Sequence, residues 1–198
     1  MNGKTGAATA HEDGVLQLAA ATTDLDAARE LVGRIGGTLY ADERAEWQHL
    51  PFRGLITVVT DAPDVLDAIG DVGMYLVYRR LKKAGEAAAL GLFPMVGAPG
   101  LSHQEADAHW RDAHGPLALT HHGFMTHYTQ LSVVKNLSGL PLDGFALCGF
   151  ASEEDLRDRF YSTEDGPAVI AADVASFSDL KRSPRRLIVT EERFALPG

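Results

Sequence analysis

The sequence predicts an α+β protein in which two ferredoxin-like βαββαβ units follow one another and form a fused, pseudo-dimeric α+β barrel. Two observations support this prediction. Apolar β-type runs alternate with segments of helical spacing, and the same order of elements occurs twice in 198 residues. A four-stranded sheet with helices on one side leaves its other face bare, so each sheet can cover the other. We therefore expect a small-molecule cavity between the two sheets.

The first unit is expected over residues 14–84, after a flexible N-terminus at residues 1–13. Its first helix is expected to begin after the capping residue Asp24 and to end at Gly36. Its second helix is expected to open at Pro63. The predicted strands of this unit lie at 15–23, between 38 and 50, at 55–60 and at 74–81.

The second unit is expected over residues 85–198. A capping box formed by Ser102 and Glu105 marks the start of its first helix, which Gly115 and Pro116 are expected to break, and these two residues can start the next helix. The other predicted elements are strands at 87–96, 125–134, 144–150 and 185–196 and helices at 152–162 and 166–177.

Composition restricts the possible partners and location. The formal net charge of -9 gives no basic surface for nucleic acid. No run reaches the roughly 18 apolar residues that span a bilayer, so neither a membrane nor a nucleic-acid partner is expected. The single cysteine, Cys148, lies among apolar residues, which predicts a buried thiol in a protein of the reducing cytoplasm.

The second half resembles the EthD domain family, most clearly over residues 88–197. Its most distinctive motif is the W-x-x-x-H-G-P pattern of residues 110–116, which Asp173 and Phe177 follow at the family's distance. The full resemblance rests on GLSHQEADAHWRDAHGPLAL at 100–119, HYTQ at 127–130, DGFA at 143–146 and DGPAVIAADVASF at 165–177.

This resemblance implies ferredoxin-like units that associate into a barrel. It also implies kinship with cofactor-free monooxygenases, polyketide cyclases and decarboxylases of small aromatic or polyketide compounds. Two departures matter. Many family members carry an acidic residue at or beside the position of Leu147, and the first half of this chain has no W-x-x-x-H-G-P motif. We therefore expect the first half to serve as the other wall of the barrel.

Five of the eight histidines lie between residues 109 and 128. Ala106, Trp110 and His114 fall on one helical stripe, so His114 is predicted to face inward. It is expected to act as an acid–base catalyst or to be a packing histidine that bonds the helix junction. Trp110 is predicted to bind the substrate, and His109, one step around the helix, to reach the cavity edge.

Two further catalytic candidates follow along the chain. His121 and His122 diverge by about 100° on a helix, so only one can face a site, and His122 is preferred. Alternation in the next strand places Tyr128 and Gln130 on one face. Tyr128 is predicted either to donate to a developing oxygen charge or to fill the core, while Gln130 and Phe124 are predicted substrate contacts.

No metal site or organic cofactor is predicted. His109 and His114 point about 140° apart on a helix, although a ligand set assembled across strands stays possible. Glycine-rich nucleotide motifs and a serine-hydrolase elbow are absent from the sequence. Asp173 and Phe177 are interpreted as a helix-end contact and a core anchor, and KRSPRR at 181–186 as a solvated loop.

The main functional hypothesis is a cofactor-independent enzyme that uses acid–base chemistry for cyclisation, decarboxylation or isomerisation of a small aromatic or polyketide-like molecule. The first alternative is a cofactor-free monooxygenase or other oxidoreductase. The second is a protein that binds a hydrophobic ligand without chemistry. The expected partner is a small hydrophobic substrate, and the expected assembly is a monomer with a fused barrel or a homodimer.

Overall fold

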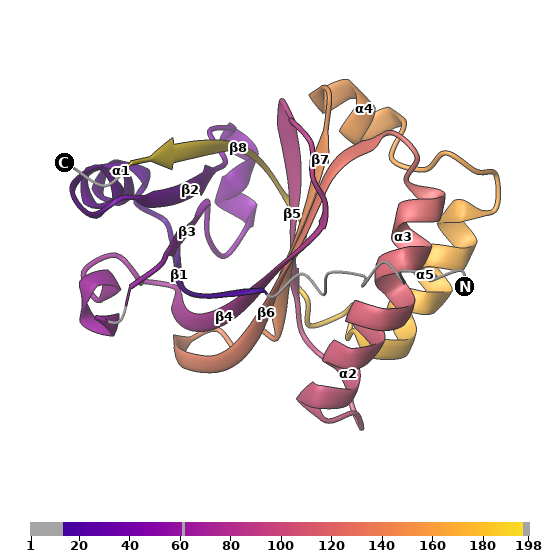
Figure 1. The fold of residues 1–198 in the computed structure, drawn as a ribbon, viewed down its shortest axis with the longest axis horizontal. Helices are drawn as coiled ribbons and strands as arrows, with labels where there is room; N and C mark the ends of the chain where they lie inside the picture. The colour runs from indigo at the N-terminus through magenta and orange to yellow at the C-terminus, as the bar shows by residue number, and fades with distance from the viewer. Residues whose placement is uncertain (1–13, 61, 196–198) are drawn as a thin grey trace, which may run out of the picture.

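A computed structural model describes residues 14–60 and 62–195, so the predicted flexible segment 1–13 lies outside the described residues. Eight antiparallel strands close into a barrel in the order β1-β3-β2-β8-β5-β7-β6-β4 (Figure 1). The strands are β1 (Val15–Thr22), β2 (Gly37–Ala41), β3 (Gly54–Val58), β4 (Gly73–Lys83), β5 (Ala89–Met95), β6 (Met125–Gly139), β7 (Gly144–Phe150) and β8 (Leu187–Phe194). The α+β barrel that the sequence predicts is therefore present.

The two halves of the chain contribute their strands in the same spatial order. In the first half the order is β4-β1-β3-β2, and in the second it is β8-β5-β7-β6. The pairs β2–β8 and β4–β6 join the halves and close the barrel. A closed barrel leaves no sheet edge to pair with another chain.

Successive side chains along each strand point alternately into the barrel and out of it. Leu131 and Val133 of β6 and Phe145 and Leu147 of β7 point inward, where they pack with residues of the other strands. These inward side chains form a continuous apolar core inside the barrel. The prediction of a cavity between the two sheets is therefore not supported, because large side chains of the described residues from both sheets pack together in that space.

The outer face of the first half is covered by one helix, α1 (Leu25–Ile35). The Asp24 side chain accepts a hydrogen bond from the Ala27 amide and caps the helix as predicted. The helix expected after Pro63 is reduced to a single 3-10 turn, η2 (Pro63–Leu66). Its connection to β4 is instead fixed by Asp71, which accepts hydrogen bonds from the amide and hydroxyl of Thr23. A further 3-10 turn, η1, spans Ala45–His49.

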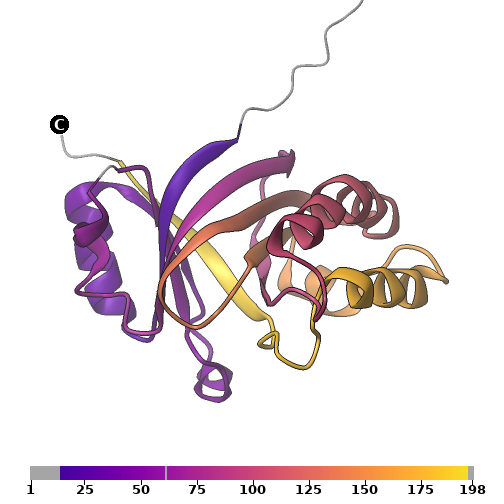
Figure 2. The same ribbon diagram turned by 90° about the horizontal axis from the view of Figure 1, so that it is seen from below.

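The outer face of the second half carries more helix, on the opposite side of the barrel from α1 (Figures 1 and 2). Here α2, η3 and α3 run on from one another and lie beside α5, while α4 follows β7. These elements are α2 (His103–His109), η3 (Trp110–His114), α3 (Gly115–His121), α4 (Glu153–Asp158) and α5 (Gly166–Phe177). None of the helices among the described residues is long and apolar enough to cross a membrane.

Candidate active site

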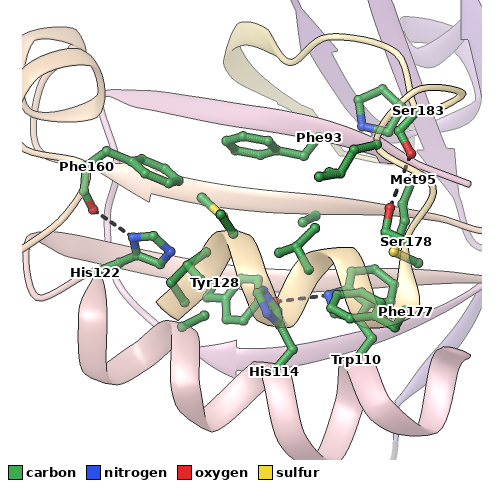
Figure 3. Close-up of a pocket in the computed structure, with 18 of the residues that line it drawn as sticks. Phe93, Met95, Trp110, His114, His122, Tyr128, Phe160, Phe177, Ser178 and Ser183 are labelled. Carbon is green, nitrogen blue, oxygen red and sulfur yellow. Dashed lines mark hydrogen bonds between the residues drawn. The ribbon is translucent and has the colours of Figure 1, made fainter. Parts of the chain in front are cut away.

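A cavity of about 410 Å³ lies between the outer face of the second half and the helices that cover it (Figure 3). Its walls are mostly apolar, and its few polar side chains come from helices, from β6, from the segment between α4 and α5 and from the segment that leads to β8. The described lining residues include Phe93, Met95, Trp110, His114, Ala118, His122, Tyr128, Ala146, Cys148, Phe160, Ile170, Val174, Phe177, Ser178, Leu180, Ser183 and Arg185. An apolar cavity with a few convergent polar groups is the usual form of a small-molecule site.

Strand alternation provides the floor of this cavity. Phe93 of β5, Tyr128 of β6 and Ala146 and Cys148 of β7 point outward, away from the barrel core. The predicted alternation of the 125–134 strand is confirmed, since Tyr128 lies on the face opposite Leu131. Burial raises the pKa of the Cys148 thiol to about 12, so this sulfur stays protonated at neutral pH.

A π-helical turn at η3 forms the wall that carries Trp110 and His114. A new helix, α3, begins at Gly115 and Pro116 as predicted, but the helical path is not interrupted there, because the amide of Gly115 bonds to the Trp110 carbonyl. A π turn shifts the backbone hydrogen bonds from i→i+4 to i→i+5, and two carbonyls of this turn also accept side-chain donors. The Gln130 side-chain amide donates to the Trp110 carbonyl at 2.9 Å, and the Lys82 ammonium donates to the Arg111 carbonyl at 3.3 Å.

His114 forms a buried pair with Asp173 of α5. The ring Nδ1 lies 2.7 Å from a carboxylate oxygen of Asp173, so in the neutral ring Nδ1–H donates and Nε2 keeps its lone pair. Burial lowers the pKa of His114 below its usual value, although the Asp173 hydrogen bond and charge act in the opposite direction. His114 is therefore a neutral imidazole at the cavity wall, and a carboxylate stands ready to stabilise its protonated form.

His122 lies two helical turns beyond His114, on the same side of α3 as Ala118, and it also lines the cavity. Its Nδ1 lies 2.7 Å from the Phe160 carbonyl oxygen, which can only accept, so Nδ1 carries the proton (Figure 3). Burial lowers the pKa of His122, and the neighbouring His114 lowers it further. Both histidines thus have an unprotonated Nε2 at neutral pH.

The Tyr128 hydroxyl accepts two hydrogen bonds. Trp110 Nε1 donates at 3.2 Å (Figure 3). Gln130 Nε2 donates at 3.0 Å. The same Gln130 amide nitrogen donates to the Trp110 carbonyl, which fixes the orientation of the amide. Burial raises the pKa of Tyr128 well above its usual range. The phenol therefore keeps its proton, and this proton meets no acceptor among the described residues.

Three predicted substrate contacts do not line the cavity. His109 lies on the far side of Asp173, where its Nε2 is 2.7 Å from the second carboxylate oxygen and its ring stacks on Phe177. Gln130 lies behind Tyr128, and Phe124 is exposed beneath the guanidinium of Arg159. Of the seven predicted site residues, Trp110, His114, His122 and Tyr128 meet at the cavity, and these three do not.

Two parts of the site were not predicted. The sequence predicts a helix-end contact for Asp173, but its carboxylate joins His114 and His109 through its two oxygens. The loop before β8, interpreted as solvated, contributes Ser183 and Arg185 to the cavity. The sequence predicts that Asp173 and Phe177 share one face of a helix, and Phe177 lines the cavity. This shared face is the sequence signal that Asp173 lies near the site. The described residues contain no group of three or more His, Cys, Asp or Glu that could hold a metal ion.

Comparisons with known proteins agree with the predicted resemblance. A structure described as an anthrone oxidase-like protein matches with a TM-score of 0.54 and 12% identity, over 92% of this chain and 94% of that one. A proposed monooxygenase from Lactobacillus acidophilus NCFM matches with a TM-score of 0.54 and 8% identity, over 93% and 97% of the two chains. No curated protein matches the sequence. The EthD domain model matches residues 98–181, which contain the π turn, both cavity histidines and Asp173, and this match confirms the resemblance that the sequence predicts.

Proposed function

We propose that this protein is a cofactor-independent oxidase or monooxygenase of a small aromatic or polyketide-like compound that carries an acidic C–H group. The observation that carries the proposal is the Asp173–His114 pair, whose imidazole lines an otherwise apolar cavity. A neutral histidine with a lowered pKa is the form that accepts a proton at neutral pH.

In the first step, His114 Nε2 takes the acidic proton of the substrate. The imidazolium that forms is stabilised by Asp173, which accepts the Nδ1 hydrogen bond at 2.7 Å. The negative charge moves to the substrate oxygen, and the Tyr128 hydroxyl can donate to it because the phenol remains protonated. Trp110 and Gln130 hold the phenol oxygen in place from behind.

In the second step, the substrate anion transfers electrons to molecular oxygen, and the carbon forms a bond to oxygen. The peroxide anion that results takes the proton back from the His114 imidazolium and becomes a hydroperoxide. For a substrate CH2 group, the hydroperoxide then loses water and leaves a carbonyl. One oxygen atom stays in the product and the other leaves as water, so the electrons balance without an external reductant. His122, with its unprotonated Nε2 in the same cavity, is placed to remove the second C–H proton as the O–O bond breaks, and this proton joins the leaving hydroxide as water.

The names of the two structural neighbours support the oxidase or monooxygenase hypothesis over the cyclase hypothesis. The same histidine and tyrosine would also serve a cyclisation, decarboxylation or isomerisation, because each of these begins with proton transfer at carbon. Oxygen consumption separates the two hypotheses, since only the oxidation uses it.

The test uses anthrone as the probe, with uncatalysed oxidation subtracted. We expect the protein to accelerate oxygen uptake and the formation of anthraquinone in equal amounts, and to produce no anthraquinone without oxygen. Substrate consumption at an unchanged rate without oxygen would instead support the cyclase hypothesis. Saturable binding of anthrone with no conversion under either condition would identify a ligand-binding protein.

We also propose that the halves are two ferredoxin-like repeats, residues 14–84 and 85–198. The identical spatial order of their strands supports this division. Because one chain closes the barrel, no second copy is required, and a monomer is expected by light scattering. A dimer whose dissociation abolishes oxygen uptake would contradict this assembly.

A further inference from the structure

Four cationic side chains lie within the six residues before β8, a cluster that stands out in a chain of net charge -9. They are Lys181, Arg182, Arg185 and Arg186. None of them makes an ion pair or a side-chain hydrogen bond with the described residues. Among the other described arginines, Arg79 alone lacks an ion pair.

Arg185 lines the apolar cavity, and its side chain is otherwise exposed. The loop that carries it is fixed to the end of β5. The Ser183 hydroxyl accepts a hydrogen bond from the Val96 amide at 2.9 Å, and the Asp179 amide donates to the Val96 carbonyl at 2.8 Å. The Asp179 carboxylate accepts hydrogen bonds from the backbone amides of residues 181 and 182, within the same loop. Arg185 is thus a held, unpaired cation at the cavity rim.

Arg186 adds a second charge beside the same cavity. Its guanidinium lies 5.8 Å from the ring centre of Phe93 and 5.5 Å from that of Phe160, and both rings line the cavity. It is half buried, and burial together with the charges of Arg157 and Arg44 lowers its pKa. Aromatic rings stabilise a desolvated cation only in part, and an anion nearby would stabilise it further.

We propose that the substrate is an aromatic acid, whose ring system fills the apolar cavity while its carboxylate binds Arg185 at the rim and is attracted by Arg186. This inference rests on the proposed function, because it assumes that the same cavity is the substrate site. It adds an anionic group to the substrate class, and it assigns that group to the loop of residues 181–186. The position of Arg185 at the rim would orient the substrate, because only its carboxylate end can reach the guanidinium while its apolar rings remain inside the cavity.

The test compares two probes of similar size, anthraquinone-2-carboxylate and the neutral 2-(hydroxymethyl)anthraquinone. Their dissociation constants are measured by calorimetry at low and high salt, for the unmodified protein and for Arg185→Gln, Arg185→Lys and Arg182→Gln. Arg182 is the matched control, since it is an unpaired cation in the same loop that does not line the cavity.

We expect the carboxylate to bind about fivefold to tenfold more tightly than the neutral probe, as one charge-assisted contact predicts. This preference should shrink at high salt, disappear in Arg185→Gln, and remain in Arg185→Lys and Arg182→Gln. Equal binding of both probes to the unmodified protein, binding of neither, or a preference that survives Arg185→Gln would overturn the inference. Because no turnover is measured, these outcomes are independent of the oxygen-uptake test.

Discussion

The outer faces of the two halves use the same strand order but different side chains. In the first half, Ile56 and Val58 of β3 point outward, are buried, and pack in one apolar cluster with residues of α1. At the same place in the second half, β7 presents Ala146 and Cys148. Small side chains on the floor, together with the longer helical cover above them, leave the space in which the two histidines meet the tyrosine. The comparison teaches that the site arises from one sheet's outer face and not from the barrel interior.

The largest expected effect concerns the base. Removing His114 by His114→Gln should lower the turnover number about 10²- to 10⁴-fold, because general-base catalysis contributes about that much. His109→Gln is the matched control, since His109 bonds the same carboxylate from outside the cavity. Oxygen uptake measures both variants. Equal losses in the two would show that Asp173 and its neighbours act only structurally.

The stability of the protein should be more sensitive to loss of side-chain volume on the outer face of the first half than on that of the second half. Ile56→Ala removes a fully buried side chain and should lower the free energy of unfolding by about 2–5 kcal/mol. Val174→Ala, at the cavity wall, should cost less than about 1.5 kcal/mol, because its side chain is already partly in open space. Urea denaturation gives both values. Equal costs would mean that the two faces are packed alike.

The stability of the protein should be less sensitive to added side-chain volume on the outer face of the second half, where the cavity lies, than on that of the first half. Ala146→Leu is expected to fill the cavity floor and to weaken binding of anthraquinone about tenfold, with little change in stability. Ala20→Leu is the counterpart on the first half, where the side chain is fully buried, and overpacking should cost about 1–3 kcal/mol. A stable Ala20→Leu variant, or unchanged binding in Ala146→Leu, would contradict the contrast.

The smallest effect is that of pH on stability. The pKa values of His114, His122 and His127 are lowered, chiefly by burial, so the unfolded chain binds more protons than the folded one just below pH 6.5. The free energy of unfolding should therefore be highest above about pH 6.5 and fall as pH drops toward the lowered pKa values, by up to about 1.4 kcal/mol per pKa unit and group. Urea denaturation at a series of pH values below and above 6.5 tests the sign of this change in the free energy of unfolding. A stability that increases on acidification would contradict it.

Local patterns predicted most of the fold. Strand alternation and capping residues placed the strands and helices within a few residues, and helical spacing brought Trp110 and His114 to one wall. The π turn escaped prediction because residues distant in sequence contact it: Gln130 donates to the Trp110 carbonyl and Lys82 to the Arg111 carbonyl. The Asp173–His114 pair joins residues 59 positions apart, and only the packing of α5 beside η3 brings them together. The position of the cavity depends on how completely each face is filled, which periodicity does not measure.

The most direct test of this account is a crystal structure of the protein with anthraquinone bound. The account predicts electron density for the rings outside the barrel, between α3, α5 and the outer face of the second half, with one carbonyl oxygen near the Tyr128 hydroxyl and a ring edge facing His114. Density for the ligand within the barrel interior, or against the face covered by α1, would contradict it.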